Sequence, residues 1–261
     1  MNIRIGACAP FGHSDYIHSL GGSHIESGFA VYAGKTDEDF DKEKNVLLPQ
    51  ALRPLSMNSM LPPTFNLYDT EKEEEIFEFV RRGMARAAEV GCKNVVFCSG
   101  GARNIPEGMD KEVAATRIAE LAARFCEIAE PYGITISIEP LRAEETNFIH
   151  TMDDAYDIVR RVPECKNLGI NPDMYHMYQG GESFDNLSKY KQYVFNVHIA
   201  DPVRRTFPRP DDECEALYVD FFKALKASGY TGNVSIEAHT KDFKADAAVA
   251  LPYINALVAD L

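Results

Sequence analysis

Four residues that can bind a metal each end an apolar segment in the second half of the sequence. The segments ITISIE, NLGINPD, YVFNVH and VSIE end at Glu139, Asp173, His198 and Glu237. Two Glu, one Asp and one His supply three oxygen ligands and one nitrogen ligand, a set that suits Mn²⁺, Mg²⁺, Co²⁺ or Zn²⁺. Because the set contains no thiolate, it does not predict a structural zinc site. It points instead to a divalent ion with room for substrate oxygens.

Strand alternation places the four candidate ligands on equivalent faces. Successive side chains of a strand point to opposite faces, so Ile136 and Ile138 share one face while Ser137 and Glu139 share the other. The other three segments repeat this pattern. In a closed parallel barrel, this polar face points inward and its carboxyl end is the functional rim. Any one of these residues alone would more often be a helix N-cap, a rim carboxylate or a core histidine, but four in register favour a metal.

The elements that must hold these residues alternate between strand-like and helix-like patterns, which predicts a parallel sheet with helical crossovers. Strands are expected near residues 2–8, 28–33, 52–57, 93–98, 134–139, 168–173, 194–199 and 233–238. Helices are expected over 72–90, 111–130, 213–227 and 246–259, and from Thr151 to a point before Pro163. Eight strands are what a closed barrel needs, so the predicted fold is one (β/α)8 TIM barrel domain over residues 1–261.

Composition excludes several classes of partner. A formal net charge of −13 does not suit binding to a phosphate backbone, so no nucleic acid is expected as a partner. The first residues lack a long apolar stretch after Arg4, and no run of 18 apolar residues occurs, so neither a signal peptide nor contact with a membrane is predicted. The six cysteines have no metal-site spacing and are expected to be reduced thiols, which favours a cytoplasmic location.

Three more polar residues follow the ligand segments on the expected loops. Glu145, His176 and Arg204 lie six, three and six residues after Glu139, Asp173 and His198. With these residues, the sequence resembles the xylose-isomerase-like barrels, which include ketose 3-epimerases, hydroxypyruvate isomerases and other sugar isomerases. The resemblance is strongest from Val95 to His239 and rests on VVFCSGGARNIPEG, IEPLRAEETNFIHT, INPDMYHM, NVHIADPVRR and VSIEAH.

The resemblance implies a function and a role for each candidate residue. One divalent ion, Mn²⁺ in the first place, would be held by Glu139, Asp173, His198 and Glu237. Substrate oxygens would be contacted by His176, Arg204 and Glu145. Glu139 and Glu237 would be the catalytic acid and base that isomerise or epimerise a small keto-sugar or hydroxy-carbonyl compound through an enediolate. The partner is then a small-molecule sugar, and a homo-oligomer is compatible with this assignment.

Several alternatives bear on this assignment. The expected second strand, GFAVYAGK, lacks the carboxylate that many relatives carry there, which leaves the choice of substrate open. An inosose-type dehydratase with the same metal site and a non-catalytic sugar-binding barrel both remain compatible with the sequence. A DNA-repair endonuclease on the same barrel needs further histidines and an Asp-x-His motif. The stretches PLSMNS, VVFCSGG and ADPVRRT lack these residues, which argues against an endonuclease.

Overall fold

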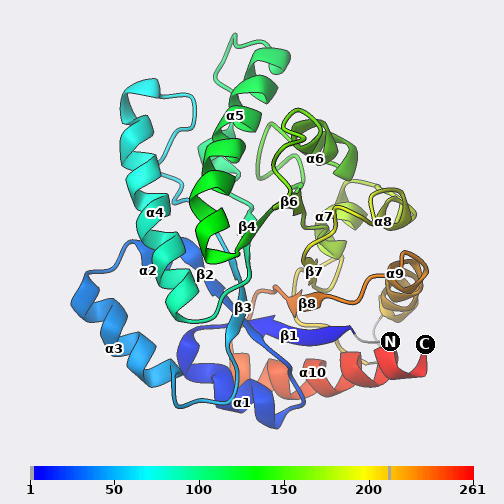
Figure 1. Cartoon of the computed structure of the whole chain (residues 1–261). Helices are drawn as coiled ribbons and strands as arrows, with labels where there is room; N and C mark the ends of the chain where they lie inside the picture. Colours follow the sequence, from blue (N-terminus) through cyan, green and yellow to red (C-terminus); the bar gives the residue numbers. More distant parts are fainter. Residues whose placement is uncertain (1–2, 211–212) are drawn as a thin grey trace.

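The barrel is a curled sheet of eight parallel strands with helices around it, in a computed structural model that describes residues 3–210 and 213–261 (Figure 1). The strands are β1 (Arg4–Cys8), β2 (Ile25–Gly28), β3 (Pro54–Asn58), β4 (Asn94–Phe97), β5 (Thr135–Ile138), β6 (Leu168–Ile170), β7 (Val197–Ile199) and β8 (Asn233–Ile236). Their order in the sheet is β6-β5-β4-β3-β2-β1-β8-β7. Parallel bridges join Ile170 to Val194 and Asp173 to His198, and they link the two outer strands of this order. The predicted (β/α)8 fold class is confirmed.

Helices surround the sheet (Figure 1). They are α1 (Ser14–Ser19), α2 (Phe29–Ala33), α3 (Asp37–Leu47), α4 (Glu73–Glu89), α5 (Lys111–Ala129), α6 (Met152–Val159), α7 (Met174–Gln179), α8 (Asn186–Lys189), α9 (Glu215–Ala227) and α10 (Phe243–Asp260). The rings of Phe77 on α4 and Phe97 on β4 both pack edge-on against Phe125 on α5, with centroids 6.0 and 5.9 Å away. Within the described residues, no helix is both long and apolar enough to cross a bilayer.

The second strand differs from its predicted position. The sequence pattern predicts a strand over 28–33, but Phe29–Ala33 is the helix α2, and the strand is Ile25–Gly28 immediately before it. Phe29, Tyr32 and Ala33 are the buried residues of α2, and their i, i+3, i+4 spacing is that of a helix face. An apolar run of only five or six residues is compatible with a strand or a helix, and in this protein the segment packs as a helix.

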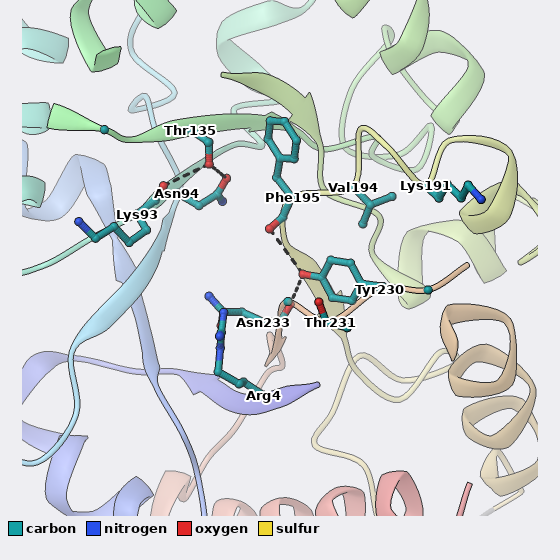
Figure 2. Close-up of a pocket in the computed structure, with 13 residues that line it drawn as sticks. Arg4, Lys93, Asn94, Thr135, Lys191, Val194, Phe195, Tyr230, Thr231 and Asn233 are labelled. Carbon is teal, nitrogen blue, oxygen red and sulfur yellow. Dashed lines mark hydrogen bonds between the residues drawn. The ribbon is translucent and has the colours of Figure 1, made fainter. Parts of the chain in front are cut away.

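The barrel interior is polar, as strand alternation predicts. The side-chain amide of Asn94 donates to the hydroxyl oxygens of Ser56 (3.1 Å) and Ser137 (3.0 Å), which come from the two neighbouring strands. At the amino-terminal end, Arg4 Nε donates to Asn233 Oδ1 at 2.7 Å, beside a cavity of about 530 Å³ (Figure 2). Among the described residues, no carboxylate side chain lines this cavity. The acidic groups that could bind a metal therefore lie elsewhere in the barrel.

Candidate metal centre

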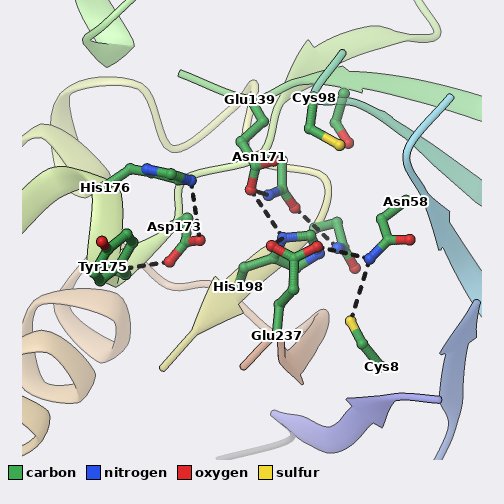
Figure 3. A network of polar contacts seen from close by, with 12 residues as sticks. Cys8, Asn58, Cys98, Glu139, Asn171, Asp173, Tyr175, His176, His198 and Glu237 are labelled. Carbon is green, nitrogen blue, oxygen red and sulfur yellow. Dashed lines mark hydrogen bonds and ion pairs between the residues drawn. The ribbon is translucent and has the colours of Figure 1, made fainter. Parts of the chain in front are cut away.

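The four candidate ligands meet at the carboxyl-terminal ends of their strands. One ligand atom from each of Glu139, Asp173, His198 and Glu237 lies within 4.8 Å of the other three. Figure 3 shows the four side chains pointing toward one another; Glu139, Asp173 and Glu237 come from just after β5, β6 and β8, and His198 comes from β7. Glu139 and His198 have no exposed surface, and Asp173 has 1%. The structure thus brings together residues that are separated by up to 98 positions in the sequence, from Glu139 to Glu237.

Two carboxylate oxygens of this cluster, Glu139 Oε2 and Asp173 Oδ2, are buried and have no hydrogen-bond partner among the described residues. The other oxygen of Asp173 accepts a hydrogen bond from the Tyr175 backbone N–H at 2.8 Å and caps the N-terminus of α7. Buried polar atoms are nearly always paired, and a buried carboxylate needs a counter-charge. The unpaired oxygens, together with the nitrogen of His198, fit a divalent cation.

His198 is held between carboxylates in the interior. Its Nδ1 lies 2.8 Å from Glu139 Oε1 and 3.6 Å from Glu237 Oε2, and its Nε2 lies 2.8 Å from Glu26 Oε1. Burial lowers the pKa of His198, but the charges of Glu26, Glu237 and Glu139 outweigh burial and raise this pKa well above its usual value. The centre therefore favours positive charge at this position, whether from a proton or from a metal ion.

Glu26 was not predicted as a site residue. It lies on β2, has no exposed surface, and contacts the nitrogen of His198 that faces away from Glu139 and Glu237. The segment IESG contains one apolar residue, so the hydrophobic pattern gives no strand signal there. The second strand was expected to lack a carboxylate, but it carries one, just before the predicted position of that strand.

The carboxylates of the centre differ in proton affinity. Burial, and then the charge of Glu139, raise the pKa of Asp173 to about 8, and burial also raises the pKa of Glu139. Burial acts in the same direction on Glu237, but the charge and hydrogen bond of His198 and the charge of Arg205 lower its pKa. Glu237 also accepts a hydrogen bond from Asn58 Nδ2 at 2.7 Å, a contact that no sequence pattern predicts. One side of the centre thus holds protons more tightly than the other.

Of the three predicted satellite residues, His176 lies beside a candidate ligand, and Glu145 is linked to one through Arg205. His176 Nε2 is 3.7 Å from Asp173 Oδ2, while its Nδ1 accepts a hydrogen bond from the Arg142 backbone N–H at 3.3 Å. Burial, and then the charge of Arg205, lower the pKa of His176 to about 4, so it is neutral at pH 7; its Nε2 also lies 3.5 Å from Arg205 Nη2. Glu145 accepts hydrogen bonds from Arg205 Nη1 at 2.8 Å and from Arg142 Nε at 2.9 Å.

Arg204, the third predicted satellite, does not face the ligands. Its side chain is 51% exposed and pairs with Asp201 and Glu213. Arg205 takes the expected place, with Nη2 3.3 Å from Glu237 Oε2 and Nη1 on Glu145. The backbone of Arg205 has φ +55°, in the left-handed region, and this turn directs the second arginine of the VRR motif inward. Spacing from His198 alone could not separate two adjacent arginines.

Comparisons with known proteins agree with this geometry. A family model described as the xylose isomerase-like TIM barrel matches residues 15–255, so the chain belongs to that family and the predicted resemblance is confirmed. An inosose isomerase of Bacillus licheniformis is 26% identical over 204 residues, which are 74% of this chain and 69% of the relative.

Solved structures share the fold. A D-psicose 3-epimerase crystallised in the presence of D-fructose superposes with a TM-score of 0.83 at 18% identity, covering 98% of this chain and 99% of its own. The IOLI protein with a bound zinc atom superposes with a TM-score of 0.70 at 19% identity, covering 98% and 95% of the two chains. At this identity, the two structures support the architecture of the barrel and not a particular substrate.

Proposed function

We propose that this protein is a divalent-metal-dependent isomerase or epimerase that acts on a small keto-sugar or hydroxy-carbonyl compound through an enediolate. The observation that carries the proposal is the cluster of three carboxylates and one imidazole, in which two buried carboxylate oxygens have no hydrogen-bond partner among the described residues. Membership of the xylose isomerase-like family and the similarity to inosose isomerase support the same class of reaction.

Glu139, Asp173, His198 and Glu237 would hold one divalent ion, with Mn²⁺ as the first candidate because three of the four ligands are carboxylates. When bound, such an ion polarises a substrate carbonyl and stabilises the negative charge that develops on its oxygen. The IOLI structure contains a bound zinc atom, so zinc is a second candidate, and Mg²⁺ and Co²⁺ also suit the ligand set.

The two glutamates would move the protons. Glu139 and Glu237 approach the centre from β5 and β8, with strands β6 and β7 on one side between them. We propose that one of them removes the proton next to the carbonyl and that either the same residue or the opposite one returns it. Return by the opposite glutamate inverts a carbon centre, whereas return to the neighbouring carbon by the same glutamate exchanges a ketose and an aldose.

His176, Arg205 and Glu145 would bind the substrate oxygens. Neutral His176 offers an N–H donor, Arg205 offers a fixed pair of donors, and Glu145 accepts hydrogen bonds. Arg205 replaces the predicted Arg204 in this role because, of these two arginines, Arg205 is the one that contacts Glu237 and Glu145. Donors in this position can share the negative charge that forms on the substrate during proton removal.

A solvent-exchange experiment tests the reaction class. The Mn²⁺-loaded protein is incubated in D₂O with ketohexoses, hydroxypyruvate and inososes, because the curated relatives are named inosose isomerases. Proton abstraction predicts a product of unchanged composition with deuterium at the carbon that epimerises or receives hydrogen. A product lighter by one water would favour the dehydratase alternative, and a transferred hydrogen that stays fully protium would indicate a hydride shift. No turnover of any compound, despite tight sugar binding, would favour the non-catalytic barrel.

A DNA control addresses the remaining alternative. The strongly negative net charge and the absence of the additional histidines from the sequence predict no incision of an abasic duplex at physiological salt. Metal-dependent incision that is lost in Asp173→Ala would contradict the sugar-isomerase assignment.

A further inference from the structure

A closed ring of hydrogen bonds lies beside the ligand cluster. Two of its members are ligands, and the other three are buried polar residues on neighbouring strands or next to them. The ring consists of Glu26, His198, Glu139, Asn171 and Asn196. All five residues have no exposed surface. We call this set the buried ring.

The contacts run continuously from one member to the next. Glu26 Oε1 and His198 Nε2 are 2.8 Å apart, and His198 Nδ1 and Glu139 Oε1 are also 2.8 Å apart. Asn171 Nδ2 donates to Glu139 Oε1 at 2.8 Å, and Asn196 Nδ2 donates to Asn171 Oδ1 at 2.9 Å. Asn196 Nδ2 also reaches Glu26 Oε2 at 3.3 Å, which closes the ring. Figure 3 shows the side of the ring formed by Glu139, Asn171 and His198.

The chemistry of these groups sets the direction of each hydrogen bond. An ionised carboxylate only accepts, so the nitrogen of His198 that faces Glu26 must carry a proton. In the metal-free centre, Nδ1 also carries a proton, which it donates to Glu139 Oε1; when a metal displaces that proton, the lone pair resides on Nδ1, the nitrogen that faces Glu139 and Glu237. Glu26 thus selects the form of His198 that can bind a metal through Nδ1.

A purely stabilising role does not account for this arrangement. Burying a carboxylate beside a histidine costs desolvation energy, and an apolar pair of similar volume is often at least as stable. Contacts from a carboxylate to the far nitrogen of a ligand histidine are known generally to fix the ring orientation and raise metal affinity. The ring also connects Glu26 to Glu139 through two amides, so it ties a second ligand to the same support.

We propose that Glu26 is a positioning residue for the metal centre, and that Asn171 and Asn196 link it to Glu139 so that two ligands are oriented as one unit. This inference depends on the metal centre of the proposed function. It adds that the centre is oriented before the metal binds, by residues that do not themselves contact the metal or the substrate.

Replacing Glu26 by glutamine tests the proposal with little change in volume. If the amide oxygen of the new side chain faces His198, its amide nitrogen opposes the donor of Asn196. If the amide nitrogen faces His198, the histidine proton must move to Nδ1, where it blocks the ligand atom. Either arrangement should weaken Mn²⁺ binding by about 10- to 100-fold in titration calorimetry, the usual cost of losing such a contact.

The position of the proton gives a readout that a loss of charge alone would not change. In ¹⁵N-labelled protein, the His198 signal is identified by its absence in H198A, and its nitrogen shifts report which nitrogen is protonated. With Zn²⁺ present, we expect a protonated Nε2 and an unprotonated, metal-bound Nδ1 in the wild type, and a larger fraction of protonated Nδ1 in E26Q at the same Zn²⁺ concentration. The matched control is E145Q, which removes one negative charge near the centre at a residue that bonds Arg142 and Arg205, and it should leave the His198 signals unchanged.

The outcomes separate this inference from the proposed function. Failure of the wild type to bind a divalent ion would contradict the metal centre itself. Wild-type binding with equal affinity and equal nitrogen shifts in E26Q would overturn only the positioning role. Should E26Q not fold, N196A decides instead, because it breaks two ring contacts and leaves Glu26 and His198 intact. Weaker Mn²⁺ binding in N196A supports the ring, and unchanged binding overturns it.

Discussion

Glu139 and Glu237 occupy matching positions just after β5 and β8, yet their surroundings are opposite. Glu139 has no exposed surface, contacts the neutral donor Asn171, and keeps one oxygen without a partner among the described residues. The Glu237 side chain is 17% exposed and receives hydrogen bonds from Asn58 and Arg205. Burial makes the first carboxylate more basic, whereas positive charge makes the second more acidic by lowering its pKa. The centre therefore has a closed, proton-holding side and an open, cation-rich side.

The largest effect is expected from removing either glutamate. Glu139→Gln and Glu237→Gln should each lower kcat by at least about 10³-fold, because a proton-transfer group and a ligand charge are lost together. Exchange of the substrate proton in D₂O should show which glutamate abstracts it. If only one glutamate does so, the variant that keeps this glutamate should still exchange deuterium into the substrate without forming product. Full activity in either variant would remove that glutamate from the chemistry.

Loss of a non-glutamate ligand should act mainly on metal content. Asp173→Ala and His198→Ala each remove a ligand atom that lies within 4.8 Å of the other three. Elemental analysis after gel filtration should find less than one equivalent of divalent ion in both variants and one equivalent in the wild type. A full equivalent at unchanged affinity in both variants would place the metal elsewhere.

The affinity for the metal should rise with pH, because Asp173 must lose its proton to bind it. The pKa of Asp173 is raised to about 8, by burial first and by Glu139 second, so below this pH a proton competes with the metal for its carboxylate. Mn²⁺ affinity should therefore rise from about pH 6 to about pH 8 and then level off, with proton release on binding. Calorimetry in two buffers of different ionisation enthalpy measures that release. An affinity that is independent of pH over this range would contradict the raised pKa of Asp173 and its competition between proton and metal.

The same shift has a consequence for stability without metal. A group whose pKa in the folded protein lies above its unfolded value stabilises the fold fully below the unfolded pKa, and this contribution disappears as pH rises through the folded pKa. For Asp173, the window runs from the ordinary pKa of 3.8 to about 8. Its contribution to the stability of the metal-free protein should decline across this window. Thermal unfolding measured over the same range checks this, and Asp173→Asn should flatten the decline of the midpoint.

Sequence patterns were sufficient to predict which residues form the candidate metal cluster, because their positions follow from strand alternation. Glu139, His198 and Glu237 end apolar runs whose period of two residues places them inside the barrel. Glu26 could not be found in this way, because its strand has four residues, and the apolar run beside it forms α2. Strand alternation places Asn171 and Asn196 on the inner face, as it does the ligands. Their hydrogen bond to each other, however, depends on the register between β6 and β7, and no local sequence pattern specifies that register.

The smallest effect is expected from replacing the arginine that contacts Glu237 on the open side, with the neighbouring arginine as a control. Arg205 contacts Glu237 and Glu145, so Arg205→Ala should lower kcat/KM by about 10- to 100-fold, equivalent to about 1.4–2.7 kcal/mol of lost transition-state binding. It should also raise the pKa of Glu237, because one of the charges that depress it is removed. Arg204→Ala is the matched control: its half-exposed side chain pairs with Asp201 and Glu213, and exposed ion pairs contribute little. Steady-state kinetics of the two variants decide between the neighbours. A large loss in Arg204→Ala with normal kinetics in Arg205→Ala would restore the assignment made from spacing and would show that the turn at Arg205 is arranged differently when substrate is bound.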